Sequence, residues 1–309
     1  MKVQIADWLA DKFSWSKLSC FSRCPQKAYK QYVLKKKEAP TLSLLWGRAV
    51  HEGQEADNLA KVRGDRLPVA KVLDAAIASF DTIGAGDSPV DIDRFRDEHG
   101  RQLGKFESSG ERAKICPIKG TVEGQFKIEL NVLELDGRTR AALVEGYTDV
   151  VSLDEYTGAR RVIDYKSGKR PVSDKEVETH LQLGLEATGA GAESGQIVNF
   201  VSYAKQKPTT KVSAAIENTQ ARWNRVLAFV SDTIRSFRHC LKTGDFPKCD
   251  PGCYWCSPTA CAFYGECYPK NYPQQSKFVE VTKIDLSGTL PPADWRKSGA
   301  AKADEAKGV

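Results

Sequence analysis

The 309-residue sequence predicts an α/β (α+β) fold in which a central mixed sheet is flanked by helices. Three observations lead to this prediction. Polar and apolar residues alternate between residues 120 and 168, which is typical of strands with one buried face. Residues 42–62 and 214–241 have the 3.6-residue period of amphipathic helices. An apolar run at residues 196–204, between two helical segments, predicts a further strand.

Local signals place the elements in order along the chain. Ser14 and Ser16 are candidate N-caps for short helices within residues 14–37, and Pro25 suits the first turn of the second helix. Turn signals at Asp136-Gly137 and Thr157-Gly158 divide residues 120–168 into three runs, which favours an antiparallel meander. No pattern assigns residues 84–118. The other expected elements are helices at 42–62, 69–83, 173–188 and 214–241 and a strand at 196–204.

Composition and hydropathy exclude several classes of protein. The mean hydropathy is −0.44 and no long apolar run occurs, so we expect no membrane span. The first 15 residues lack the apolar segment of a secretory signal, which predicts a cytoplasmic protein. The length suits a single domain, expected over residues 1–286, followed by a disordered tail rich in Gly, Pro, Ala and Lys at 287–309.

The net charge of +6 is unevenly distributed. Residues 12–37 contain eight basic residues, five aromatic residues and no acidic residue. Cations that neutralise phosphates, together with rings that stack on bases, are typical of a groove for single-stranded nucleic acid. The rings could instead pack in the core, which is the commoner role of aromatic side chains. The basic residues of this segment predicted to contact DNA are Lys17, Arg23, Lys27 and Lys30.

Two acids and a lysine provide the clearest chemical signal. Asp164 and Lys166 share one face of an apolar strand, and the preceding turn could bring Asp149 opposite Asp164. Carboxylates of this kind bind Mg²⁺ or Mn²⁺, and the ion with a neighbouring lysine suits phosphodiester hydrolysis. The alternative is a surface salt bridge between Asp164 and Lys166. The Asp/Glu-x-Lys triplet recurs only at residues 305–307, where no apolar run precedes it.

The block GYTDVV…RRVIDYKSGK resembles the PD-(D/E)XK nucleases, in particular the branch that contains the RecB and AddB nuclease domains and the CRISPR-associated exonucleases. That family has Gly-x-x-Asp, a hairpin, and Asp-x-Lys followed by a small residue and Gly. The matching residues are Gly146, Asp149, Asp164, Lys166 and Gly168. The resemblance covers most of residues 14–270. It implies a restriction-endonuclease-like fold with basic helices at 14–62, a catalytic core at 120–241 and a cysteine cluster at 249–267.

Two flanking motifs extend the resemblance. Gly47 and His51 match a Gly-x-x-x-His helix motif, which implies that His51 is a ligand of the catalytic ion with Asp149 and Asp164. A histidine with an ordinary structural role in a helix is the alternative. Gln182 matches a Gln-Leu motif and would join the catalytic residues, although Glu186 replaces the tyrosine that usually follows.

Lys169 and Arg170 follow the catalytic lysine directly in the sequence. In a nuclease of this family they would lie close to the scissile phosphate and contact DNA. They could equally be turn residues that face water.

Five cysteines lie between residues 249 and 267. Zinc prefers two short-spaced pairs, and only Cys253-x-x-Cys256 has that spacing, whereas a [4Fe–4S] cluster accepts one distant thiolate. By resemblance to phage-encoded relatives, the expected cluster ligands are Cys24, Cys256, Cys261 and Cys267. Cys253 could replace one of the three late ligands, and Cys249 is a less favoured replacement. Cys20 is the alternative to Cys24. Such a cluster would cross-link the N-terminal and C-terminal parts of the domain. Cys116 and Cys240 are expected to be buried small hydrophobic residues.

Together these features predict a Mg²⁺- or Mn²⁺-dependent DNA exonuclease that prefers single strands or free ends and carries a structural [4Fe–4S] cluster. The sequence contains no P-loop, so a helicase or recombination partner would have to unwind duplex DNA. Recombination, repair and spacer processing all fit this activity. The alternatives are a non-catalytic module that binds single-stranded DNA and a zinc-stabilised interaction protein.

Overall fold

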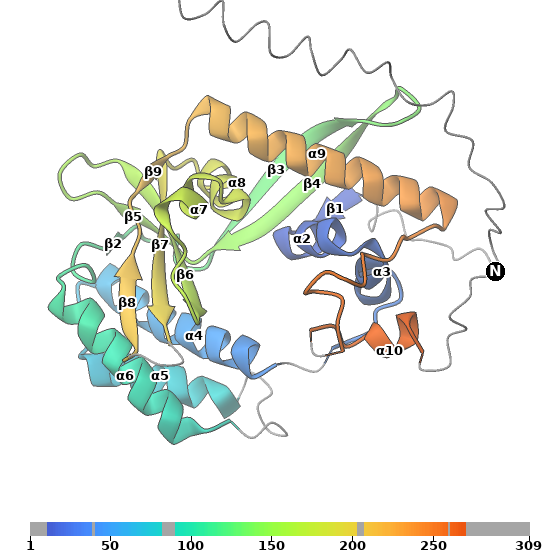
Figure 1. Ribbon diagram of the computed structural model, residues 1–309. Helices are drawn as coiled ribbons and strands as arrows, with labels where there is room; N and C mark the ends of the chain where they lie inside the picture. The colour runs from blue at the N-terminus through green and yellow to red at the C-terminus, as the bar shows by residue number, and fades with distance from the viewer. Residues whose placement is uncertain (1–10, 39–40, 82–89, 203–206, 259, 270–309) are drawn as a thin grey trace, which may run out of the picture. The chain divides into compact units, whose positions relative to one another are not determined.

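The computed structural model describes residues 11–38, 41–81, 90–202, 207–258 and 260–269 (Figure 1). The tail predicted at 287–309 lies outside these ranges. The chain divides into two units, residues 1–264 and residues 265–309. The elements below belong to the first unit, except that α10 (Tyr264–Cys267) crosses the boundary. Within the described ranges, no helix combines the length and the apolar character needed to cross a bilayer.

The larger sheet is mixed, as predicted. Its strand order is β2-β5-β6-β7-β8, and β9 also pairs with β7. β6 and β7 run parallel and the other pairs are antiparallel. The parallel pair needs a crossover, which α7 and α8 supply. The strands are β2 (Cys116–Pro117), β5 (Val150–Leu153), β6 (Arg160–Gly168), β7 (Ser194–Val201), β8 (Thr209–Val212) and β9 (Ile216–Glu217).

The expected three-stranded meander is wrong, because its middle run contains two strands that belong to different sheets. β4 (Thr139–Thr148) pairs with β3 (Gly124–Leu133) and with β1 (Lys12–Phe13) in a separate three-stranded sheet. β5 begins two residues after β4 ends and pairs with β6. Asp149 is the residue between them. Both expected turns are present, with Gly137 and Gly158 at φ 78° and 71°, values that favour glycine.

Helices cover both faces of the larger sheet (Figure 1). Ile163 and Tyr165 of β6 pack against the helices on one face, and Val162 packs toward the other. α6 lies within the segment that no sequence pattern assigned. The helix is hard to recognise because its sequence is highly charged and buries only a narrow stripe around Phe95 and Leu103. The first face is covered by α4 (Leu42–Val62), α5 (Val69–Ala78), η2 (Ser79–Asp81) and α6 (Ile92–Ser108), and the second by α7 (Asp174–Glu178) and α8 (Leu181–Gly189).

The aromatic rings of the basic segment form part of a second core. α2 (Trp15–Arg23) packs with α9 (Gln220–Thr243) against the smaller sheet. Phe13 and Phe21 are 2% and 5% exposed, and their ring centroids lie 5.7 and 5.2 Å from that of Phe237. For these two rings the packing interpretation is therefore correct. After α2 come α3 (Pro25–Ala28) and a π-helical turn, η1 (Tyr29–Val33).

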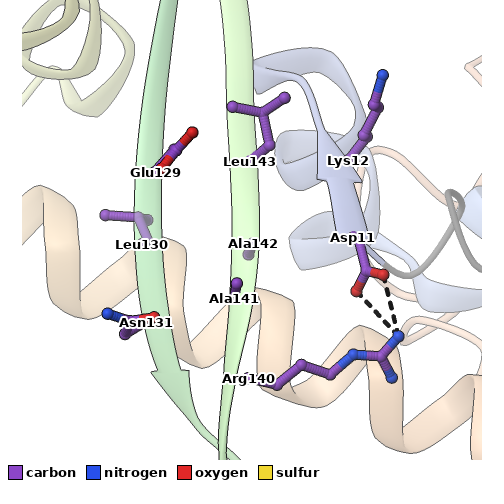
Figure 2. Close-up of a pocket in the computed structure, with 9 residues that line it drawn as sticks. All are labelled: Asp11, Lys12, Glu129, Leu130, Asn131, Arg140, Ala141, Ala142 and Leu143. Carbon is purple, nitrogen blue, oxygen red and sulfur yellow. Dashed lines mark hydrogen bonds and ion pairs between the residues drawn. The ribbon is translucent and has the colours of Figure 1, made fainter.

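Ion pairs attach the β3–β4 hairpin to its neighbours. Arg238 of α9 is buried and donates to Glu134 and to the carbonyl oxygen of Ala141. Figure 2 shows the outer face of the smaller sheet, where Arg140 of β4 pairs with Asp11 at 3.0 Å across a concave patch of about 470 Å³. Each positive charge in these contacts is thus matched by a carboxylate or a carbonyl oxygen.

Candidate active site

α4 places His51 beside the start of β5 in the larger sheet. The Thr41 hydroxyl caps this helix by accepting a hydrogen bond from the Leu44 amide at 3.3 Å. A Cβ at Gly47 would lie only 3.2 Å from the Ser167 hydroxyl of β6, so glycine allows the helix and strand to approach closely. His51 follows four residues later, about one helical turn along the same face.

The separation of β4 and β5 gives Asp149 its position. In the β5–β6 ladder Val150 pairs with Ile163, so the next residues outward, Asp149 and Asp164, lie across from each other. One Asp149 oxygen accepts a hydrogen bond from the Tyr165 amide at 2.7 Å, and the other lies 3.1 Å from His51 Nδ1. The acid is therefore fixed by one strand and one helix.

Asp164 and Lys166 lie on the same face of β6. Asp164 is 2% exposed, and the Lys166 ammonium forms an ion pair with its Oδ2 at 2.9 Å. Apart from this ion pair, Oδ2 accepts no hydrogen bond from any residue that the structure describes. Lys166 also donates to the Gln182 side-chain oxygen of α8 at 3.1 Å. Asp164 and Lys166 of β6 thus meet Gln182 of α8 on one side, and Asp149 lies across from Asp164.

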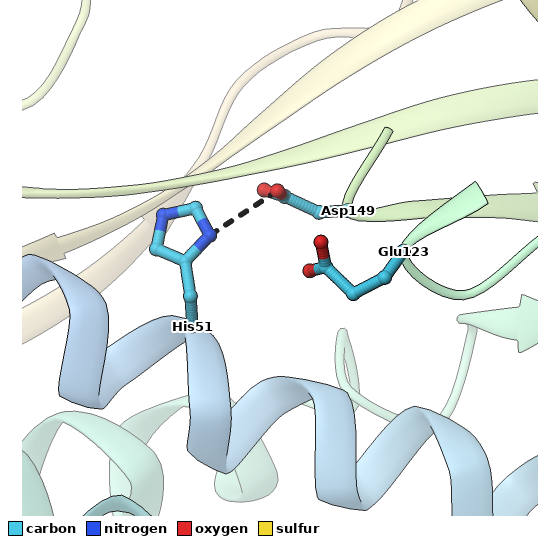
Figure 3. A group of neighbouring side chains, drawn as sticks. All are labelled: His51, Glu123 and Asp149. Carbon is cyan, nitrogen blue, oxygen red and sulfur yellow. Dashed lines mark hydrogen bonds and ion pairs between the residues drawn. The ribbon is translucent and has the colours of Figure 1, made fainter. Parts of the chain in front are cut away.

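Glu123 is a further residue of this site that the sequence analysis missed. Metal-binding atoms of His51, Glu123 and Asp149 all lie within 4.8 Å of one another (Figure 3). The Asp136-Gly137 turn could have revealed Glu123. It sets Gly124 opposite Thr148, and the next residues outward are Glu123 and Asp149. Glu123 adopts a positive φ of 50°, and its amide donates to the Asp149 carbonyl oxygen at 3.0 Å.

The titratable groups of the site perturb one another. Burial lowers the pKa of His51, but the Asp149 carboxylate outweighs this effect and raises it to about 9. Burial and then the charge of Asp149 raise the pKa of Glu123 to about 7. Burial acts to raise the pKa of Asp149, yet His51 and the Tyr165 amide bring it below its usual value. Burial raises the pKa of Asp164, against the effect of Lys166.

This donor set suits a hard divalent cation. His51, Glu123 and Asp149 offer one imidazole and two carboxylates, and carboxylate oxygens are what Mg²⁺ and Mn²⁺ prefer. The exposed fractions of the His51 and Asp149 side chains are 34% and 17%, so the group is open enough to exchange an ion. The buried Asp164 Oδ2 has remaining acceptor capacity beside this group.

The predicted DNA-contacting cations lie in different environments. Lys17 and Lys30 are only 5% and 6% exposed, and the Lys17 ammonium lies over the Phe13 ring at 4.1 Å from its centroid. These two side chains belong to the protein interior because their segment packs in the second core. Lys27 pairs with Glu38 at 2.9 Å. Arg23, Lys169 and Arg170 are exposed, and Arg170 pairs with Glu176 at 2.7 Å.

Two aromatic side chains outside the basic segment are exposed. Tyr254 and Trp255 have exposed fractions of 74% and 50%, and their rings form an edge contact at 5.1 Å. The Arg23 guanidinium lies 4.7 Å from the Trp255 ring centroid. Rings and a cation thus meet on the surface, but the rings come from the cysteine-rich segment and not from residues 12–37.

The structure also brings several cysteines together. The thiols of Cys249 and Cys253 lie 3.7 Å apart. Burial raises the pKa of Cys249, and hydrogen-bonding contacts with the thiols of Cys24, Cys256 and Cys253 raise it further. The Cys24 sulfur accepts a hydrogen bond from the Lys27 amide at 3.4 Å. Cys249, the less favoured alternative in the sequence analysis, therefore lies among Cys24, Cys253 and Cys256.

The other cysteines are placed separately. Burial raises the pKa of Cys261, with a smaller contribution from Cys24, and Cys20 donates to the Gln31 side chain at 3.1 Å. Cys240 is buried in the second core as predicted. The prediction that Cys116 is buried is wrong, because it lies in the short edge strand β2 with its side chain exposed. Cys267 belongs to the second unit of the chain.

Comparison with protein families matches residues 12–267 to the PD-(D/E)XK nuclease superfamily. The match spans most of the chain, so this protein belongs to that superfamily. Membership confirms the predicted class, a nuclease, and agrees with the mixed sheet flanked by helices. Nucleases of this superfamily use divalent metals, which agrees with the group formed by His51, Glu123 and Asp149.

Several solved structures are similar to this chain, among them the following two. The protein SSO0001 is 15% identical, with a TM-score of 0.34, and the match covers 72% of this chain and 75% of that protein. A proposed exonuclease from Eubacterium rectale is 12% identical, with a TM-score of 0.44, and the match covers 91% of this chain and 94% of that protein. No curated protein sequence matches the chain.

Proposed function

We propose that this protein is a Mg²⁺- or Mn²⁺-dependent deoxyribonuclease that degrades single-stranded DNA from its ends. The observation that carries the proposal is the position of His51, Glu123 and Asp149 beside the Asp164–Lys166 ion pair. A divalent cation bound there would supply Lewis-acid activation of water and of the scissile phosphate. His51, Glu123 and Asp149 would hold this ion, with Asp164 Oδ2 as a further oxygen donor.

The side chains of this protein would contribute orientation and charge. Lys166 is held between the Asp164 carboxylate and the Gln182 amide oxygen, so its ammonium is fixed before substrate binds. A fixed ammonium can position the attacking water and neutralise charge that develops on the phosphate. Asp149 holds His51 in place and is itself held by the Tyr165 amide.

The single-strand preference rests on the surface formed by Arg23, Tyr254 and Trp255. Exposed rings can stack on unpaired bases, whereas bases within a duplex are already stacked on one another. The Arg23 guanidinium beside Trp255 adds a positive charge for the phosphate backbone. Because the sequence has no P-loop, a helicase or recombination partner would supply single strands from duplex DNA.

The proposal includes a [4Fe–4S] cluster, which some members of the RecB- and AddB-like branch contain. Four thiolates are the usual ligands of such a cluster, and one can come from a distant part of the sequence. Cys249 and the three thiols around it, those of Cys24, Cys253 and Cys256, would supply these four ligands. The ligand set first expected shares Cys24 and Cys256 with this one and has Cys261 and Cys267 in place of Cys249 and Cys253. Anaerobic purification with iron, sulfide and zinc analysis separates a cluster from a zinc site.

Nuclease assays on end-labelled single and double strands with Mn²⁺ test the catalytic proposal. The wild type should shorten single strands from an end, and Asp164→Asn and Lys166→Ala should lose at least about a hundredfold in rate. Asp232→Asn is the matched control, because this acid lies exposed on α9 outside the site. Equal rates for all four proteins would contradict the proposal and favour a non-catalytic DNA-binding module.

A further inference from the structure

Glu186 is an acidic residue buried on the inner side of α8. It is 5% exposed, and its helical neighbours Leu183, Leu185 and Ala187 are fully buried apolar residues. Placing a carboxyl group in such surroundings is unfavourable unless a hydrogen bond compensates for the lost water. Its Oε1 accepts one from Gln182 Nε2 at 2.8 Å, one helical turn earlier. This partner leads directly to the candidate active site.

Gln182 connects Glu186 to the catalytic lysine. Its Nε2 donates to Glu186, while its Oε1 accepts from the Lys166 ammonium, which in turn pairs with Asp164. A primary amide has one donor end and one acceptor end, so a partner at one end determines which atom lies at the other. A residue that accepts from Nε2 therefore keeps the amide oxygen facing Lys166.

We propose that Glu186 is a positioning residue that orients the Gln182 amide and thereby fixes the Lys166 ammonium beside Asp164. The inference deepens the proposed nuclease function and rests on it. Without an acceptor at position 186 the amide can rotate and present its NH₂ group to the ammonium, which cannot accept a hydrogen bond. The lysine then loses one of the two contacts that hold it.

The ionisation behaviour of Glu186 agrees with an acceptor role that needs no negative charge. Burial, and next the charge of Asp164, raises its pKa well above the usual value for a glutamate. The carbonyl oxygen of a protonated carboxyl group still accepts a hydrogen bond from Gln182. A glutamine side chain at position 186 offers the same acceptor, whereas a methionine of similar length offers only a weak one.

Two variants test this role by activity. Glu186→Gln should retain kcat within about twofold, while Glu186→Met should lose about tenfold or more in kcat with KM for single-stranded DNA unchanged. Thr188→Val on the same helix is the control, because it removes a hydrogen bond to Asn218 outside this chain of contacts. Wild-type kcat in the methionine variant, or equal losses in both Glu186 variants, would overturn the proposal.

Hydrogen exchange of the Gln182 side-chain NH₂ group, followed by NMR, tests the same role without catalysis. The protons should exchange slowly in the wild type and in Glu186→Gln, and at least about tenfold faster in Glu186→Met or in a second variant, Glu186→Ala. Unchanged exchange in the apolar variants would overturn the inference. If the wild type fails to cleave DNA, the nuclease proposal fails, and the exchange rates still decide whether Glu186 orients Gln182.

Discussion

Binding of a divalent cation to the active site should release protons. A histidine must be neutral and a glutamate ionised to act as ligands, so the cation competes with any proton bound there. In the metal-free protein burial lowers the pKa of His51, but Asp149 outweighs this effect and the pKa is about 9. Burial and the charge of Asp149 together raise the pKa of Glu123 to about 7. At pH 8, therefore, His51 carries a proton that the cation must displace.

The size of the effect follows from these two values. Between about pH 7 and pH 9 one proton leaves for each cation bound, so the affinity should rise about tenfold per pH unit. Below about pH 7 Glu123 is also protonated, so the cation must displace a second proton. The affinity should then rise about a hundredfold per pH unit. Above about pH 9 the affinity should stop rising.

Titration calorimetry with Mn²⁺ measures this linkage. Repeating each titration in buffers with different ionisation heats gives the number of protons released. His51→Gln should abolish the slope between pH 7 and pH 9, and Glu123→Gln should remove only the additional slope below pH 7. A Mn²⁺ affinity that stays constant from pH 7 to pH 9 in the wild type would refute the assignment of His51 as a ligand.

The stability of the metal-free protein should fall as the pH rises, whereas the affinity for the cation should increase. The pKa of His51 is about 6.5 in the unfolded chain and is raised by Asp149 in the folded protein. The pairing therefore stabilises the fold fully below about pH 6.5, and this contribution is lost as the pH rises through about 9. Thermal unfolding with and without Mn²⁺ across this range should show the two opposing trends.

Three further predictions concern the close approach of α4, the exposed rings and the cysteines. The Cβ of an alanine at position 47 would lie 3.2 Å from the Ser167 hydroxyl, so Gly47→Ala should be less favourable by about 1 kcal/mol when Ser167 is present than in a Ser167→Ala background. Denaturant titrations of the wild type, both single variants and the double variant measure this difference in the free energy of unfolding. In an Asp164→Asn background, Trp255→Ala should weaken binding of a labelled thymidine oligomer about tenfold by fluorescence anisotropy. The control Tyr156→Ala removes a 91% exposed ring elsewhere and should not weaken binding of the oligomer. An equal loss of affinity in both variants would exclude stacking at Trp255. Cys249→Ser should abolish most of the bound iron, whereas Cys116→Ser at an exposed position should leave it unchanged; normal iron content in the first variant would remove Cys249 from the ligand set.

Local signals in the sequence were sufficient for much of the fold. The helix at 42–62 has the predicted bounds, and the turns at Gly137 and Gly158 are present, because helical period and glycine conformation are determined within short segments. The helix expected at 214–241 begins later, at Gln220, because β9 occupies residues 216–217. The alternation of apolar residues correctly indicated the strands that lie between residues 124 and 168.

The arrangement of strands between sheets could not be predicted in the same way. Alternation reports that one face of a strand is buried, but it does not report which sheet buries that face. The run that contains Asp149 therefore looked like one strand, although β4 and β5 belong to different sheets. For the same reason the burial of Lys17 depends on a contact with Phe237, more than 200 residues away, which no local pattern records.

Crystals soaked in Mn²⁺ would test the central claim most directly, through the anomalous signal of the metal. We predict one strong peak bounded by the His51 imidazole and the Glu123 and Asp149 carboxylates, next to Asp164 and Lys166. Occupied manganese sites elsewhere with none among these residues would contradict the account.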